Sequence, residues 1–215
     1  MSGRSSAREW ALIALLAGCG SSGAAPPAVP EADPAKVTAW AAAMLTNAPT
    51  LGMVRDCAAA DLRGALPLTQ NSLLRLAGKP LTPDPEHADW LNPPELDAAP
   101  VQVLLAAAPG SPAARQAAAA VLAAPAALVY RVDNVDAPLA LGVKELKRGT
   151  VGARIIRYEK GAPVCVQVFF AQNDREVSRK AIEASDRAIV DPKVAAGLRA
   201  DLTARYLATA PRVTP

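Results

Sequence analysis

The chain has 215 residues, of which 23 are Lys or Arg and 20 are Asp or Glu, so its formal net charge is +3. This near balance argues against a nucleic-acid-binding protein and against strong attraction to anionic lipids. Hydrophobic residues make up 51% of the chain but aromatic residues only 4%. The length leaves room for one domain, and we expect its core to be built from Ala, Leu and Val.

The N-terminus has the pattern of an export signal. Residues 1–9 are polar and carry Arg4 and Arg8, and residues 10–18 form the apolar run WALIALLAG. A basic segment followed by 7–15 apolar residues is typical of a secretory signal peptide. The run is about half of the ~20 residues that span a bilayer, which disfavours a transmembrane helix. A buried helix of the fold is the other alternative.

The apolar run ends in Leu16-Ala17-Gly18-Cys19, which resembles the lipobox of bacterial lipoproteins. The resemblance covers only residues 1–19. It implies cleavage before Cys19 and attachment of lipid to the Cys19 thiol. Gly20, in place of Asp, implies delivery to the outer membrane, facing the periplasm, if the host is Gram-negative.

The lipidated cysteine fixes how the rest of the chain is divided. Residues 18–23 also fit G-x-G-x-x-G, but we reject a dinucleotide site because no strand precedes them and Pro26-Pro27 follows. Residues 19–34 are rich in Gly, Ser, Ala and Pro and are interpreted as a flexible tether. Residues 35–212 are expected to form a single globular domain. Removal of residues 1–18 takes away two arginines and one glutamate, which leaves 21 basic against 19 acidic residues.

Three helices are predicted in the first part of the domain. Their start signals are Asp33-Pro34, Thr69 and Ser111-Pro112, and the helices end near Asn47, Gly78 and Pro125. Residues 51–64 and 101–107 fit no single element. Residues 79–100 contain six prolines with His87 and Trp90. A loop of this length is often functional, and Trp90 favours a loop that is fixed to the domain.

The second part predicts strands followed by helices. Residues 127–135, 150–158 and 163–171 are rich in β-branched and aromatic residues, with a hairpin turn at Lys160-Gly161-Ala162. A short edge strand is predicted at 139–143. Helices are expected at 174–190 and after Asp191-Pro192, with Val194, Leu198, Leu202 and Tyr206 on one stripe. The predicted fold is α+β: a small antiparallel sheet of three to four strands packed with N-terminal and C-terminal helices.

Two cysteines remain after Cys19. An oxidising compartment would allow Cys57 and Cys165 to form a disulfide. Cys165 lies on the strand face opposite Val164 and Val166, so such a bond would tie the helical part to that face. Two separate buried thiols are the alternative, because free cysteine is among the most buried residue types.

No residue pattern predicts a catalytic centre, a cofactor site or a metal site. His87 is the sole histidine, so two-histidine metal motifs are excluded, and the sequence contains no G-x-S-x-G turn, P-loop or C-x-x-C. The leading hypothesis is a non-enzymatic lipoprotein that acts as a scaffold or binding module for another envelope protein. Its contact surface would be the exposed sheet face or the loop with Trp90.

Two alternatives remain open. The first is an envelope enzyme of hydrolase type that uses carboxylates from the proline-rich loop, where Glu86, Asp89 and Glu95 are clustered. Such an enzyme needs two carboxylates at a defined separation across a cleft. The second is a lipoprotein that binds a small ligand, which would require a concave pocket.

Overall fold

The computed structural model describes residues 29–50, 52, 54–140, 146–183 and 192–211. The predicted signal peptide, Cys19 and the predicted tether up to residue 28 lie outside the described residues. Within the described part, no helix is both long and apolar enough to cross a membrane.

The helices begin where the sequence signals place them. Asp33 caps α1 (Pro34–Thr46) by accepting a 2.9 Å hydrogen bond from the Ala35 N–H, and Thr69 and Ser111 cap α2 (Gln70–Leu76) and α4 (Pro112–Ala123) in the same way. These three helix predictions are confirmed. The undecided run at 101–107 is largely helical. The other helices are α3 (Ala99–Ala106), α5 (Arg175–Glu183) and α6 (Pro192–Thr209).

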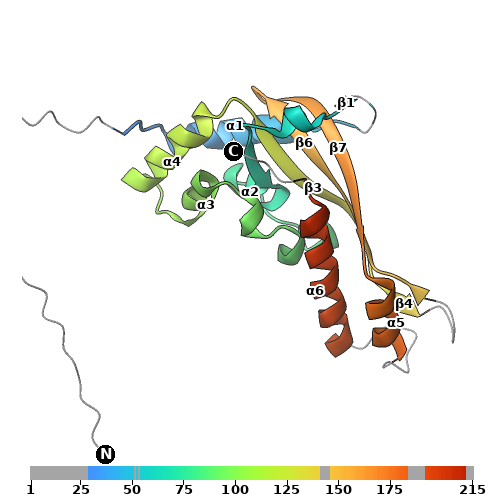
Figure 1. The fold of residues 1–215 in the computed structure, drawn as a ribbon. Coiled ribbons are helices and arrows are strands. Elements are labelled where there is room, and N and C mark those ends of the chain that lie inside the picture. Colours follow the sequence, from blue (N-terminus) through green and yellow to red (C-terminus); the bar gives the residue numbers. More distant parts are fainter. Residues whose placement is uncertain (1–28, 51, 53, 141–145, 184–191, 212–215) are drawn as a thin grey trace, which may run out of the picture.

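One five-stranded sheet forms the centre of the fold (Figure 1), in the order β1-β7-β6-β3-β2. Its three long strands are β3 (Ala127–Asp136), β6 (Thr150–Glu159) and β7 (Ala162–Gln172), which pair antiparallel as the sequence predicts. Lys160 and Gly161 have φ values of 51° and 80°, which is the left-handed conformation that a tight hairpin turn requires.

The predicted small antiparallel sheet of three to four strands is wrong, although the α+β class holds. The sheet is mixed, because β1 (Arg55–Asp56) lies parallel to β7 and β2 (Leu66–Thr69) lies parallel to β3. These strands are two and four residues long, too short to show an alternating pattern. Of the predicted edge strand at 139–143, residues 141–143 lie outside the described residues. The first two residues form β4 (Leu139–Ala140), which pairs with β5 (Leu146–Lys147) in a separate ribbon and not at the edge of the main sheet.

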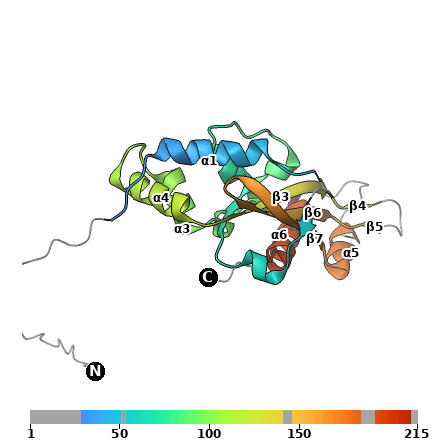
Figure 2. The same ribbon diagram turned by 90° about the horizontal axis from the view of Figure 1, so that it is seen from above.

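Helices cover both faces of the sheet, as Figure 2 shows, with α1 on one side and α6 on the other. Val129, Ile156 and Val166 pack against α1 and α4 in one core cluster. On the opposite face, Tyr130, Ile155 and Phe169 join Leu202 and Tyr206 of α6 in a second cluster. The described part of the chain also contains four short 3₁₀ turns: η1 (Ala59–Leu62), η2 (Pro85–His87), η3 (Asp89–Leu91) and η4 (Pro94–Leu96).

Candidate functional site

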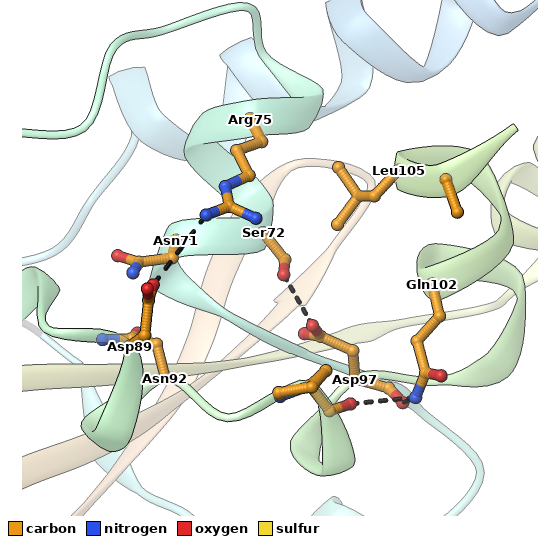
Figure 3. A pocket seen from close by; sticks show the side chains of 10 residues that line it. Asn71, Ser72, Arg75, Asp89, Asn92, Asp97, Gln102 and Leu105 are labelled. Atoms are coloured by element: carbon orange, nitrogen blue, oxygen red, sulfur yellow. Dashed lines mark hydrogen bonds and ion pairs between the residues drawn. The ribbon is translucent and has the colours of Figure 1, made fainter. Parts of the chain in front are cut away.

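A polar pocket of about 440 Å³ lies between α2, the proline-rich loop and α3 (Figure 3). Helix α2 follows β2 directly, so the sheet edge fixes one wall of the pocket. The other walls come from the loop that the sequence singles out and from α3. The lining residues are Asn71, Ser72, Arg75, Asp89, Asn92, Pro94, Asp97, Gln102, Leu105 and Ala106.

Asp97 is the buried acid of this pocket. Its Oδ1 accepts a 2.6 Å hydrogen bond from the Thr69 N–H, and its Oδ2 accepts a 2.6 Å hydrogen bond from the Ser72 hydroxyl. Burial raises the pKa of Asp97 above its usual value, while the hydrogen bonds from Ser72 and Thr69 oppose that rise only in part. Asp97 therefore joins the end of the loop to the N-terminus of α2.

The amide side chains in and around the pocket hold the loop in place. Asn71 Nδ2 donates to the His87 carbonyl, Asn92 Nδ2 donates to the Glu86 carbonyl, and Gln102 Nε2 donates to the Pro94 and Asp97 carbonyls. Within the described part of the chain, Asn92 Oδ1 and Gln102 Oε1 accept no hydrogen bond. These two amides therefore offer acceptors to a ligand.

An open ion pair lies at the rim of the pocket. Arg75 Nη2 and Asp89 Oδ1 are 3.9 Å apart, and their side chains are 52% and 88% exposed. Figure 3 shows the guanidinium of Arg75 directed toward the carboxylate of Asp89. A pair this long and this exposed contributes little to stability, so the two groups can exchange partners.

The pocket does not bring together the three acids predicted from the sequence. Of Glu86, Asp89 and Glu95, the pocket is lined by Asp89 alone. His87 Nδ1 lies 2.9 Å from Asn71 Oδ1, so its ring also fixes the loop. Ser72 bonds to Asp97, and in the described ranges no serine hydroxyl contacts His87.

The position of Asp97 predicts a pH dependence of stability. Because its pKa is raised, the folded protein keeps this proton to a higher pH than the unfolded chain does. The protonated carboxyl of Asp97 therefore makes its full contribution to the free energy of unfolding below about pH 3.8. This contribution is lost as the pH rises through the raised pKa. We expect Asp97→Asn to gain stability relative to the wild type as the pH rises from about 3.5 to 7. Urea unfolding at several pH values measures this difference.

The control for this experiment is Asp84→Asn, which changes an exposed loop aspartate. This variant gives the effect of the same substitution at a solvent-exposed position, against which the pH dependence of Asp97→Asn is compared. A constant difference for Asp97→Asn would show that Asp97 has the same pKa in the folded and unfolded states.

The sequence predicts Trp90 as a second candidate contact. Trp90 is half-buried and packs against the core cluster on the α6 side of the sheet. It also forms one wall of a shallow, mainly apolar groove of about 580 Å³ along α6. The α6 side of this groove consists of Ala196, Arg199, Ala200, Thr203, Ala204 and Leu207. Trp90 therefore fixes the loop to the domain, as its position in the sequence favours.

The sheet itself exposes apolar side chains on one half of the face that carries α1. Val168 and Phe170 of β7 are 62% and 55% exposed. The strand register places Val168 beside Arg154 of β6, and Arg154 beside Arg131 of β3. Helix α1 covers Val166, Ile156 and Val129, which lie side by side across the sheet. Further along the strands, the same face of the sheet carries exposed and charged residues. We call Arg131, Asp133, Arg154, Val168 and Phe170 the open sheet patch.

The open sheet patch has more positive than negative side chains. Asp133 Oδ1 accepts from Nε and Nη2 of Arg154 at 2.9 and 2.6 Å and lies 3.3 Å from Nε of Arg131. One carboxylate therefore serves two guanidinium groups. Arg154 Nη1 is buried and has no hydrogen-bond partner among the described residues. The patch carries a net positive charge beside two exposed apolar side chains.

Cys57 and Cys165, the pair considered in the sequence, form a disulfide with an S–S distance of 2.08 Å and a Cα–Cα distance of 4.9 Å. Cys57 follows β1, and its N–H donates to the Val166 carbonyl of β7. The bond therefore fixes the two-residue strand β1 to the sheet edge.

Comparison with known proteins gives no relative. No protein-family model, curated protein or solved structure is significantly similar to this chain. Among the described residues, no group of three or more His, Cys, Asp or Glu side chains is arranged to hold a metal ion.

Proposed function

We propose that the protein is a lipoprotein anchored through Cys19 to the outer membrane and that its domain is a non-enzymatic binding module for an envelope protein. The resemblance of residues 16–19 to a lipobox supports the anchor. The observation that carries the binding role is the open sheet patch. Exposed large apolar side chains grouped on one surface often belong to an interaction site.

The sheet patch fits this role better than the Trp90 groove. Trp90 is half-buried and already packed against the domain, whereas Val168 and Phe170 are more than half exposed. In addition, β1 pairs with β7 only at Cys165 and Val166. From residue 167 onward, the outer edge of β7 borders no other strand of the described part of the chain.

The charge of the patch defines its partner. Arg131 and Arg154 share the single carboxylate of Asp133, so a further carboxylate can pair with the arginines. Arg131 is the accessible member, with a side chain that is 36% exposed. The partner is therefore a protein segment that packs an apolar side chain on Val168 and Phe170 and places a carboxylate beside Arg131.

Site-specific photo-crosslinking in intact cells tests this proposal. A photoreactive residue in place of Val168 should give one discrete adduct, and the same residue in place of Val103 should not. Val103 is a matched control because it is a 41% exposed valine on α3, away from the patch. Phe170→Ser and Arg131→Gln should each reduce the adduct by about tenfold, the loss expected for one contact of 1–2 kcal/mol.

The location is tested in the same strain by fatty-acid labelling. The Cys19→Ala variant should lose the label and leave the membrane fraction. A label that persists in Cys19→Ala would refute the anchor. An absent adduct at residue 168, or an adduct that neither Phe170→Ser nor Arg131→Gln weakens, would refute the binding surface.

A further inference from the structure

We propose that the polar pocket between α2, the proline-rich loop and α3 binds a small zwitterion: an α-amino acid with an aliphatic side chain. This site is separate from the open sheet patch, so each of the two proposals can be refuted without affecting the other. The volume of about 440 Å³ lies within the range of small-molecule pockets. The charges and acceptors that line the pocket define the chemistry of the ligand.

Arg75 receives the carboxylate of the ligand. It projects from α2 over the pocket (Figure 3), and its side chain is half exposed. Its ion-pair partner Asp89 is 3.9 Å away, beyond a direct hydrogen bond. A planar guanidinium binds a carboxylate through two parallel N–H donors, so the ligand offers Arg75 a better contact than Asp89 does.

Asp89 and Asn92 receive the ammonium group. Both lie on the same side of the pocket in Figure 3. The amide donors of Asn92 are directed to the Glu86 and Ala88 carbonyls, so its Oδ1 remains as an acceptor. An ammonium group has three donors and no acceptor, which matches a carboxylate and a carbonyl oxygen. Because the ligand carries both charges, it replaces the Arg75–Asp89 pair and leaves no charge uncompensated.

The rest of the pocket selects the side chain of the ligand. Leu105 and Ala106 form an apolar wall on α3. Asp97 is buried and each of its oxygens already accepts a hydrogen bond, from Thr69 and from Ser72, so we assign the ammonium group to the exposed Asp89. An aliphatic group of a few carbons therefore lies against Leu105, and the charged end lies at the rim.

Isothermal titration of the purified full chain with L-leucine tests this assignment. N-acetyl-L-leucine lacks the ammonium and L-leucinamide lacks the carboxylate, so both should bind at least tenfold more weakly than L-leucine. Arg75→Gln and Asp89→Asn should each weaken L-leucine binding by tenfold or more, as expected for loss of a hydrogen bond to a charged group. Arg75→Lys keeps the charge but loses the bidentate geometry and should be intermediate.

Arg179→Gln is the matched control. Arg179 is also a half-exposed arginine in ion pairs, but it lies on α5, so its loss should leave L-leucine binding unchanged. The proposal is overturned if L-leucine does not bind at millimolar concentration, or if the two derivatives bind as tightly as L-leucine. It is also overturned if Arg75→Gln and Asp89→Asn bind L-leucine like the wild type. The photo-crosslinking at residue 168 does not depend on any of these outcomes.

Discussion

Reduction of the Cys57–Cys165 disulfide should lower the free energy of unfolding by about 4–5 kcal/mol, in line with a closed loop of about 100 residues in the chain-entropy model. The two cysteines are 108 positions apart in the sequence. Without the bond, the unfolded chain gains the freedom of that whole loop. The folded state also loses the link that holds β1, which has only two residues, to β7.

The measurement is urea unfolding of the wild type with and without dithiothreitol, beside the double variant Cys57→Ala/Cys165→Ala. The reductant should shift the wild-type midpoint strongly and leave that of the double variant unchanged. The reduced wild type and the double variant should have similar stability, apart from the small cavity that alanine leaves at the buried Cys165. A wild-type midpoint that dithiothreitol does not move would contradict the stabilising role of the bond.

The elements that the sequence predicted correctly are those whose signals are local. A capping side chain contacts an N–H only two or three residues away, as Asp33 and Thr69 do, so the start of a helix can be read from a few adjacent residues. The same is true of the turn at Lys160 and Gly161, whose strands pair directly with each other. Interactions between residues that are close in the sequence define these elements.

The sheet order was not predictable in this way. Strand β2 exists because residues 66–69 pair with residues 127–130, about 60 positions later, and Pro67 within it disfavours a strand by itself. At the edge of the sheet, however, a proline is tolerated because one side of the strand needs no N–H donor. Only the tertiary pairing therefore distinguishes β2, and likewise β1, from loop.

The sequence did not predict the pocket, for a related reason. The sequence marks the proline-rich loop as unusual, but Asp97 is one of several acids in and around it. The residues next to Asp97 do not distinguish it from the other acids. Its burial depends on Thr69 and Ser72, 28 and 25 positions earlier. Asn71, Arg75 and Gln102 give no signal in the sequence, because isolated polar residues on helices are usually exposed to solvent.

Tyr206→Ala should destabilise the domain by about 3–5 kcal/mol, the cost of truncating a large aromatic side chain in a core. Tyr206 is completely buried, and its ring stacks on Phe169 of β7 with centroids 5.5 Å apart. Together with Leu198 and Leu202, it forms the stripe through which α6 covers the sheet. The sequence predicts this stripe from its spacing, with Val194 as the fourth member. Loss of the ring leaves a cavity between α6 and β7.

Tyr206→Phe distinguishes the packing of the Tyr206 ring from the burial of its hydroxyl. The Tyr206 hydroxyl is buried and has no hydrogen-bond partner among the described residues, so its removal relieves an unsatisfied polar group and keeps the ring. We expect Tyr206→Phe to be as stable as the wild type or up to about 1 kcal/mol more stable. Urea unfolding gives both values, and hydrogen exchange should show lost protection of the α6 amides in Tyr206→Ala but not in Tyr206→Phe. If the two variants were destabilised equally, the hydroxyl rather than the ring would hold α6 on the sheet.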